Sequence, residues 1–546
     1  GKQAAPPGTF YWKKGFDFSS MGASITIMSI LSDRLSAEIL QARQRVYTVG
    51  EPTPLQRLNL PGIQAPVYAK REDLGPIRAY KWRGAFNCMA ALSQEARDKG
   101  IVAASAGNHA QGVALAARVL NCHATIFMPR STPEVKQTEV RRHGGRHVKI
   151  MLHGDCYDET AAAAHEYTET HGCTFVHPYD DLVTMAGQGT LADEVVMSGE
   201  GPFDRAYVAI GGGGLAASVA CWLNKFRPRI KVIGVEGIDQ ASMKTSIEQG
   251  RRVNLDYVDV FCDGTAVHIP GELTYPLCRE LVDEFVTVTN NEVCQAIRAM
   301  WESSRVVPEP SGAMSLAGFL KQWNRGEVKP EEKSFVVISG ANMDFTHLTQ
   351  IARQAGIGNH ETRYLRISMD SKRGQVLKYL RHIPQDTTLV DVQYGKTEGN
   401  TQHPVFGIAA SDEDLDTIRT TLKKKGIEFE DISEDDDVRF RMIHYQPELC
   451  QHPLFVHIEF PERAGAFLDF MERIADLASL CYFNYTYTGE RVGRALVGME
   501  FDTAEDRETI RKRMGAFSKN IIRSIREISP EAFQRIMGSR QLTGNH

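Results

Sequence analysis

Residues 101–120 read Ile-Val-Ala-Ala-Ser-Ala-Gly-Asn-His-Ala-Gln-Gly-Val-Ala-Leu-Ala-Ala-Arg-Val-Leu, and this stretch decides the fold class. A short apolar run, 101–104, ends in a turn of small and polar residues, and a second apolar run, 113–120, follows. This order predicts a buried strand, a turn and a helix. Because open α/β sheets bind ligands where such strands end, the turn at 105–112 is a candidate binding site.

Five more short apolar runs alternate with helical stretches between about Ser36 and Ala355. They are residues 124–128, 147–151, 207–210, 232–235 and 335–338. Strands that alternate with helices form parallel sheets with helices on both faces. We therefore expect residues 36–355 to form an α/β domain of two subdomains.

The composition excludes several classes of protein. The net charge is −5 and the charges of both signs are interspersed, so nothing attracts nucleic acid or an anionic membrane. No apolar run approaches the roughly 20 residues of a membrane span. The ten cysteines show no CxxC pair and no spacing of metal ligands. We expect reduced cysteines, no metal, no membrane and no nucleic-acid partner.

The pattern changes after Arg363 to strand, helix, strand, strand, and this order occurs twice, with the helices predicted at 375–380 and 466–474. Gly374 recurs as Gly465, and Gly407 recurs as Gly498, in each case 91 residues later. Such self-similarity indicates two related structural modules. A tandem pair of this kind serves either as an oligomerisation scaffold or as an effector-binding pair, and we favour the second interpretation.

These patterns predict the domain boundaries. An N-terminal extension, 1–35, precedes the α/β domain. The first C-terminal module takes 361–440 and the second takes 453–546, with an acidic connector at 433–453 between them.

Lys81 stands between Tyr80 and Trp82 at the start of a predicted helix, 82–97. A lysine amine whose pKa is lowered by its surroundings can form a Schiff base with an aldehyde cofactor. Taken alone, the string is more typical of a solvated helix start than of a Schiff-base lysine. Three turns downstream decide between these interpretations, because together they provide what pyridoxal phosphate needs.

The first turn offers an anion site at the start of a helix. Its backbone amides and the helix dipole would hold a substrate carboxylate. The predicted substrate-binding residues are Ser105, Ala106, Gly107, Asn108 and His109. The Asn108 amide can also bond a phenolic oxygen such as that of the pyridoxal ring. A bare helix cap would explain the serine and asparagine as well.

The second turn follows the strand at 207–210 and opens a helix at 216–224. Its amides can wrap a phosphate, and the predicted cofactor-binding residues are Gly211, Gly212, Gly213, Gly214 and Leu215. Read with Ala216 and with Glu236 after the next strand, the turn also fits a dinucleotide fingerprint, as in a nicotinamide-dependent dehydrogenase. Four consecutive glycines fit a phosphate cup better, and the dehydrogenase interpretation gives Lys81 no role.

The third turn begins at Ser339, directly after the buried strand 335–338. A neutral hydroxyl facing the pyridine nitrogen makes the cofactor a mild electron sink, which favours prompt β-elimination. A further turn, 309–313, borders the pocket or simply caps a helix with Ser311.

Together these motifs resemble the fold-type-II pyridoxal-phosphate enzymes and, within them, the biosynthetic threonine deaminases (threonine ammonia-lyases). The matching strings are KRED at 70–73, YKWRGA at 80–85, SAGNHAQGVA at 105–114, AGQGTLADE at 186–194, GGGGLAA at 211–217, EPSGA at 309–313 and SGAN at 339–342. The resemblance runs from about Ala42 to the end of the chain. It implies a parallel-sheet catalytic domain like that of the tryptophan synthase β-chain, followed by two ACT-like regulatory modules.

The resemblance also implies residue roles. Lys81 would be the catalytic Schiff-base lysine, Tyr80 would lie beside the ring, Asn108 would bind the ring hydroxyl and Ser339 the pyridine nitrogen. Three departures are visible: Ala79 replaces the family's serine, Ser-Lys-Arg-Gly at 371–374 replaces a Pro-Glu-like opening, and the N-terminal extension has no counterpart. In addition, Ala106 stands where the related serine racemases carry a second serine, which argues against racemisation.

The implied function is deamination of L-threonine, and more slowly of L-serine, to a 2-oxo acid and ammonia, as in isoleucine biosynthesis. Lys81 would act as the base at Cα. Isoleucine would inhibit and valine relieve through the C-terminal modules of a homotetramer or homodimer. The expected compartment is the cytoplasm, or a mitochondrion or plastid if a targeting segment was removed. A dehydratase without isoleucine control, a dehydrogenase and a non-enzymatic amino-acid sensor are the alternatives.

Overall fold

The computed structural model of the chain describes residues 21–345 without a break and shorter segments after them. These are 347–358, 362–370, 388–393, 401–403, 405–409, 412–433, 435, 452–461, 470, 473–474, 476–486, 492–518, 521–529 and 531–532. The chain divides into two compact units, Gly1–Met343 and Asp344–His546. Gly374, Gly465 and most of the predicted connector at 433–453 lie outside the described residues, as do the first 20 residues of the predicted extension.

The first unit contains a larger sheet of six strands in the order β1-β2-β10-β7-β8-β9. The strands are β1 (Leu55–Leu58), β2 (Val67–Arg71), β7 (Arg205–Ala209), β8 (Lys231–Gly237), β9 (Glu284–Val288) and β10 (Ser334–Ile338). Only β1 pairs antiparallel with its neighbour, and the other pairs are parallel.

A smaller, wholly parallel sheet has the order β5-β4-β3-β6. Its strands are β3 (Ile101–Ala104), β4 (Ala124–Met128), β5 (Val148–Leu152) and β6 (Thr174–Phe175). The helices of this unit are α1 (Met21–Val46), α2 (Lys81–Ala91), α3 (Gln94–Asp98), α4 (Asn108–Val119), α5 (Glu134–Gly144), α6 (Tyr157–His171), α7 (Leu182–Met197), α8 (Gly214–Phe226), α9 (Ser242–Glu248), α10 (Thr274–Leu281), α11 (Asn290–Ser304) and α12 (Pro310–Asn324). None of the helices in the described part of the chain is long and apolar enough to cross a membrane.

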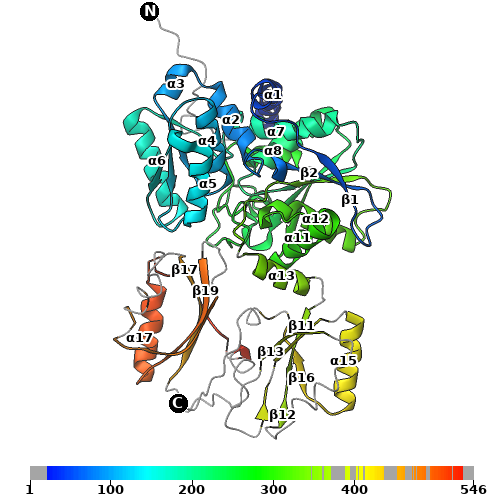
Figure 1. Cartoon of the computed structure of the whole chain (residues 1–546), viewed down its shortest axis with the longest axis vertical. Helices are drawn as coiled ribbons and strands as arrows, with labels where there is room; N and C mark the ends of the chain where they lie inside the picture. Colours follow the sequence, from blue (N-terminus) through cyan, green and yellow to red (C-terminus); the bar gives the residue numbers. More distant parts are fainter. Residues whose placement is uncertain are drawn as a thin grey trace, which may run out of the picture. The chain divides into compact units, whose positions relative to one another are not determined.

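The larger sheet is covered on both faces, by helices that include α7, α8 and α12 (Figure 1), and the contacts of strand β7 show which helix covers which face. The Tyr207 ring meets Phe319 of α12 edge to face at 5.6 Å, and its hydroxyl donates to Gln322 of the same helix at 2.7 Å. Ala206 and Val208 lie instead in the core that contains the buried residues of α7 and α8. Since successive strand residues point to opposite faces, α12 lies on one face and α7 and α8 on the other.

All six predicted strands of this unit are confirmed, with bounds that differ by at most two residues. The helix predicted at 82–97 is wrong in one respect, because it breaks after α2. Leu92 is extended, and Ser93 begins α3 by accepting the Ala96 N–H on its hydroxyl at 3.2 Å. The helix predicted from residue 113 begins earlier, at Asn108, so the turn predicted at 105–112 contains the first turn of α4.

The second unit contains α13 (His347–Gly358) and two four-stranded sheets with the orders β13-β15-β11-β16 and β18-β19-β17-β20. A two-stranded pair, β12 with β14, is also present. The bounds are β11 (Thr362–Ile367), β12 (Met369–Asp370), β13 (Thr388–Gln393), β14 (Thr401–Gln402), β15 (Val405–Ala409), α15 (Asp412–Lys424), β16 (Phe429–Asp431), β17 (Leu454–Pro461), β18 (Ser479–Thr486), β19 (Val492–Glu500), α17 (Ala504–Gly515) and β20 (Ser524–Glu527).

The two four-stranded sheets share their register as well as their order. Gly407 in β15 pairs with Asp391, next to a bulge in β13. Gly498 in β19 pairs with Tyr482, next to a bulge in β18, and both residues lie 91 positions after their counterparts. Each copy continues with a helix and a fourth strand that the sequence reading missed. The helix predicted at 375–380 lies outside the described residues, as does most of the one predicted at 466–474.

Candidate active site

Lys81 is brought to the larger sheet by a short backbone pairing. The N–H of Tyr80 donates to the carbonyl of Ser339 at 3.0 Å, and the N–H of Ala341 donates to the carbonyl of Arg78 at 2.9 Å. Helix α2 begins at the next residue, Lys81. Lys81 and Ser339, the predicted partner of the pyridine nitrogen, therefore lie on adjacent segments of backbone.

The Lys81 side chain is partly buried, and its Nζ donates to the carbonyl of Pro178 at 2.8 Å. The amine lies 5.3 Å from the centre of the Tyr80 ring. Desolvation lowers the pKa of Lys81 to about 8. At pH 7 the neutral, nucleophilic amine is then about 300-fold more abundant than it is for an ordinary lysine.

Two imidazoles, the buried ring of His109 and the half-buried ring of His177, lie near this amine. The Nε2–H of His109 donates to the carbonyl of Val176 at 2.9 Å, and burial, together with the Lys81 charge, lowers the His109 pKa to about 3. His177 accepts the Asp180 N–H on Nδ1 at 2.8 Å, and burial lowers the His177 pKa to about 4. Both rings are neutral near pH 7, so Lys81 is the group of this cluster that titrates in the physiological range.

In the turn predicted to bind the substrate carboxylate, some polar groups are already hydrogen-bonded within the protein. The N–H of Ser105 donates to the carbonyl of Phe127 at 3.0 Å, and the Ser105 hydroxyl accepts the Gly107 N–H at 3.2 Å. The amides left for an anion are those of the first turn of α4, from Asn108 onward, which have no partner within the helix. Within the described residues the buried Nδ1 of His109, in the same turn, has no hydrogen-bond partner.

The side chain of Asn108 contacts two residues that the sequence reading did not assign. Its Nδ2 donates to Glu309 at 2.7 Å, and its Oδ1 accepts from Asn342 at 2.8 Å. Both partners lie in turns that the sequence predicted near the pocket, 309–313 and the turn that begins at Ser339, but neither side chain was given a role there. Ser339 itself is buried, and its hydroxyl lies 3.5 Å from the carbonyl of Ser311, at the limit of a hydrogen bond.

The loop 211–214 between β7 and α8 leaves no room for side chains. A Cβ on Gly212 would lie 2.4 Å from the Tyr179 ring, and one on Gly214 would lie 2.8 Å from the Tyr179 carbonyl. Gly213 has a φ of 95°, which residues with a Cβ rarely adopt. Close packing and backbone conformation together therefore require glycine here.

The remaining members of the predicted cup complete the start of α8. A Cβ on Gly211 would lie 2.9 Å from Thr265 Cα, and Leu215 is buried in the first turn of the helix. The free amides at this helix start, unobstructed by side chains, suit a phosphate.

Glu236 argues against the dinucleotide interpretation. Its carboxyl accepts the N–H groups of Met243 at 2.9 Å and Lys244 at 2.8 Å, at the start of α9. Burial raises the Glu236 pKa to about 8. The carboxyl that would bind a ribose is therefore engaged inside the protein.

A segment that the sequence reading missed joins the lysine to the glycine loop. The Pro178 carbonyl accepts from Lys81 and, at 3.2 Å, from Gln188 Nε2. The next residue, Tyr179, packs its ring on Gly212, and Asp180 then accepts the Leu273 N–H at 2.8 Å. A signal was present, because Pro-Tyr-Asp-Asp is a turn sequence directly after the short strand β6.

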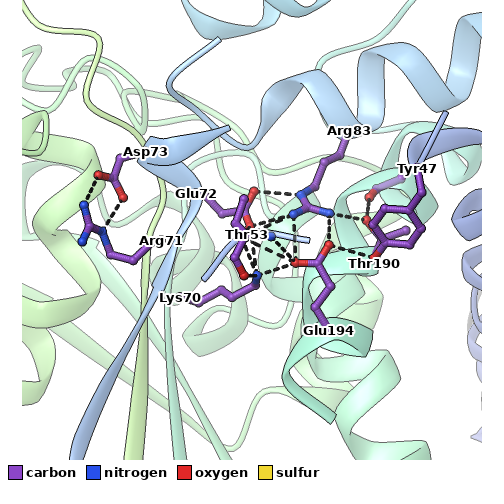
Figure 2. Close-up of polar contacts among 10 residues, drawn as sticks. Tyr47, Thr53, Lys70, Arg71, Glu72, Asp73, Arg83, Thr190 and Glu194 are labelled. Atoms are coloured by element: carbon purple, nitrogen blue, oxygen red, sulfur yellow. Dashed lines mark hydrogen bonds and ion pairs between the residues drawn. The ribbon is translucent and has the colours of Figure 1, made fainter. Parts of the chain in front are cut away.

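A buried ionic network surrounds Arg83, and Figure 2 shows its members. Lys70 comes from β2, Glu72 directly follows that strand, Arg83 comes from α2, and Glu194 comes from α7. Arg83 donates to both oxygens of Glu72, at 2.8 and 3.0 Å, and to both oxygens of Glu194, at 2.5 and 3.1 Å. Lys70 donates to Glu194 and to the Thr53 hydroxyl. Two cations thus meet two carboxylates, so the network is balanced in charge.

This network includes Lys70 and Glu72 of the KRED string. The four charged side chains of the network are at most 5% exposed. The string's other pair, Arg71 and Asp73, forms a separate two-bond salt bridge at 2.9 and 2.7 Å. Because Arg83 lies two residues after Lys81, the network anchors the helix start that carries the lysine.

Comparison with known proteins places the chain in a family. A model described as "Pyridoxal-phosphate dependent enzyme" matches residues 46–340, and one described as "C-terminal regulatory domain of Threonine dehydratase" matches residues 450–523. The chain is 37% identical to "L-threonine dehydratase biosynthetic IlvA" of Burkholderia multivorans over 85% of its length and 92% of that protein. It is 34% identical to "Threonine dehydratase, mitochondrial" of Schizosaccharomyces pombe over 84% of its length and 77% of that protein.

A solved structure agrees. The processed form of threonine deaminase isoform 2 from Solanum lycopersicum matches with a TM-score of 0.56 and 39% identity, over 60% of this chain and 89% of that one. The fold is therefore that of the fold-type-II enzymes, followed by a regulatory unit.

The residues present fit pyridoxal phosphate. A partly buried amine of lowered pKa is available for its aldehyde, and the loop 211–214 presents backbone amides at a helix start where packing admits only glycine. Motif order, fold and comparisons agree. The chain belongs to the biosynthetic threonine dehydratases, a family of pyridoxal-phosphate-dependent lyases.

Proposed function

We propose that the chain deaminates L-threonine, and more slowly L-serine, and that Lys81 both carries the cofactor and moves the Cα proton. The observation that supports this most is the Lys81 amine, partly buried, of lowered pKa, and joined through residues 178–179 to the glycine loop. When bound, pyridoxal phosphate supplies an electron sink for the electrons of the Cα–H bond.

The residues that would hold the cofactor are those predicted from the sequence. Lys81 would bind its aldehyde carbon, and the amides of 211–215 its phosphate. The Ser339 hydroxyl would face the pyridine nitrogen, Asn108 the ring hydroxyl, and Tyr80 would lie beside the ring. These assignments are supported by the shared sheet edge and by the contacts of the preceding subsection.

The proposed chemistry uses few protein groups. The substrate carboxylate binds at the start of α4, over the residues Ser105, Ala106, Gly107, Asn108 and His109. The freed Lys81 amine would accept the Cα proton, and the β-hydroxyl would leave as water with a proton supplied through the cofactor phosphate that the residues 211–214 would hold. The product, 2-aminocrotonate, takes up one water and gives 2-oxobutanoate and ammonia.

The second unit is proposed to bind branched-chain amino acids, with isoleucine inhibiting and valine relieving. The match of residues 450–523 to a regulatory domain supports an amino-acid effector. The division into 36–355, 361–440 and 453–546, and assembly as a homotetramer or homodimer, belong to the same proposal. We keep the cytoplasm as the expected compartment, or an organelle if a targeting segment was removed. The fission-yeast relative is named as mitochondrial.

The purified full chain tests this function. We expect a visible cofactor absorption band, formation of 2-oxobutanoate from L-threonine, and suppression of that formation by isoleucine. Protein that makes no oxo acid after addition of pyridoxal phosphate would contradict the activity. Turnover indifferent to isoleucine would retire the effector assignment and leave the catalytic one standing.

A further inference from the structure

Three side chains from distant parts of the sequence form a line of hydrogen bonds at the edge of the sheets. Asn108 Nδ2 donates to Glu309 Oε1 at 2.7 Å, and Asn342 Nδ2 donates to Asn108 Oδ1 at 2.8 Å. Asn108 begins α4, Glu309 precedes α12, and Asn342 follows β10, so these two bonds join three elements.

The chemistry of the neighbours fixes the orientation of both amides. Asn342 Nδ2 also lies 2.6 Å from the backbone carbonyl of Ile77 and 3.2 Å from Gln111 Oε1. A backbone carbonyl can only accept, so the nitrogen of Asn342 must face it. The Asn108 oxygen then accepts from that nitrogen, and its amide nitrogen is turned to the other side, toward Glu309.

Packing holds the third member in place. The Glu309 side chain is 4% exposed, and its N–H donates to the Gly340 carbonyl at 3.1 Å. A Cβ on Gly340 would lie 2.4 Å from Glu309 Oε1, so the carboxyl occupies the space that a side chain at position 340 would need.

We propose that Asn342 and Glu309 are positioning residues that lock the carboxamide of Asn108 with one N–H left over for the ring hydroxyl of the cofactor. This inference rests on the proposed role of Asn108. A donor fixed at a phenolic oxygen favours the ionised oxygen, and a fixed donor loses no entropy when the cofactor binds. Neither positioning residue touches the reacting atoms; both act through Asn108.

Asn342→Asp tests the lock without a change of size. The substitution replaces a donor by an oxygen that faces three acceptors, those of Ile77, Asn108 and Gln111. Asn108 must then turn its amide or leave its place. We expect a shifted visible absorption maximum, a dissociation constant for pyridoxal phosphate about tenfold or more above that of the unaltered protein, and a kcat lowered by a similar factor. KM should change by less than about threefold, because the substrate carboxylate is bound by backbone amides.

Asn254→Asp is the matched control, since Asn254 is exposed on a loop of the same unit. It makes the same chemical change, and its absorption maximum, cofactor affinity and kcat should equal those of the unaltered protein. Far-ultraviolet circular dichroism and the thermal midpoint show whether each variant is folded.

A second pair of variants decides the question if Asn342→Asp does not fold. Glu309→Gln keeps an oxygen that can accept from Asn108, whereas Glu309→Leu removes the acceptor. We expect Glu309→Gln to exceed Glu309→Leu by about tenfold in kcat and to keep an absorption maximum nearer to that of the unaltered protein. A normal maximum and kcat in both Asn342→Asp and Glu309→Leu would overturn the proposal. Loss of the band in Lys81→Ala tests the cofactor assignment separately.

Discussion

The Nζ atom of Lys81 and the carbonyl oxygen of Pro178 lie 2.8 Å apart. A carbonyl can only accept, so the amine donates, and it shares this acceptor with Gln188. A free Lys81 amine therefore has a fixed resting partner on the segment that also packs on the glycine loop. An amine held in this way needs little reorganisation before it accepts a proton from Cα.

Lys81→Ala should abolish both cofactor attachment and turnover. The variant removes the proposed covalent anchor and the proposed base together, so we expect no visible band from attached cofactor and a kcat lowered by at least about a thousandfold. Absorbance and 2-oxobutanoate formation are the measurements. Lys99→Ala, at a lysine paired with Glu95 on the surface, is the control. A Lys81→Ala protein that kept its band and its turnover would refute the assignment.

The lowered pKa of Lys81 predicts how the cofactor-free protein captures pyridoxal phosphate. Only the neutral amine attacks the aldehyde, and desolvation favours the neutral form, so its pKa is about 8 instead of 10.5. The rate constant for capture should therefore rise with pH up to about 8 and then level off. Stopped-flow absorbance measures it, with a free lysine derivative as the reference. A rate constant for capture that kept rising toward pH 10 would mean that the pKa of Lys81 is not lowered.

Gly212→Ala should weaken cofactor binding more than it weakens the fold. The added Cβ would lie 2.4 Å from the Tyr179 ring, so the ring or the loop must move. Because the same segment holds Lys81 through Pro178, we expect a dissociation constant for pyridoxal phosphate raised about tenfold or more. Gly515→Ala, where an added Cβ meets nothing within 4 Å, is the control. Unchanged affinity in Gly212→Ala would remove the loop from the proposed phosphate site.

The buried network should show strong coupling between Lys70 and Glu194. Lys70→Met or Glu194→Gln alone leaves an unbalanced buried charge and should destabilise the unit by about 3–5 kcal/mol. The double variant restores the charge balance. Its loss of unfolding free energy should therefore be about 1–3 kcal/mol smaller than the sum of the losses of the two single variants. Tryptophan fluorescence during urea unfolding reports on this unit, because all five tryptophans lie within residues 1–343.

The exposed pair Lys99–Glu95 is the matched control for this cycle. Its two side chains are 56% and 81% exposed, and solvent screens the interaction. The corresponding cycle should show no resolvable coupling. Additive costs for Lys70→Met and Glu194→Gln would mean that the two charges do not stabilise one another.

Local sequence was enough to predict six strands of the two sheets of the first unit, whereas β1, β2, β6 and β9 were not predicted. Buried strands such as β3 and β10 are short apolar runs that end in Gly- or Ser-rich turns, and both signals lie within a few residues. The break after α2 was not predicted, because the residues around Leu92 and Ser93 carry neither glycine nor proline. Helix α15 did carry a signal, with acidic residues at its start and lysines at its end, which the repeat-based reading overlooked.

The candidate site was predictable only in part, for a different reason. The motifs containing Lys81, Asn108 and Ser339 are local strings. The contact of Lys81 with Pro178 depends instead on strand order, since β6 lies beside β3 and brings residues after it to the same edge. The network of Arg83 likewise joins residues from three elements. Such long-range partners cannot be found from spacing within one segment.

The shared register of the two C-terminal sheets has a consequence for folding. Strands β13 and β18 begin 91 residues apart and carry their bulges at equivalent places, so the backbone of either strand matches the partner strand of the other copy. Exchange of strands between copies is a known failure of repeated modules. In this chain the backbone geometry does not prevent an exchange of strands between the two sheets. Correct pairing therefore depends on the side chains that differ between the two copies. Mispaired intermediates should therefore accumulate first in variants that make the two copies more alike.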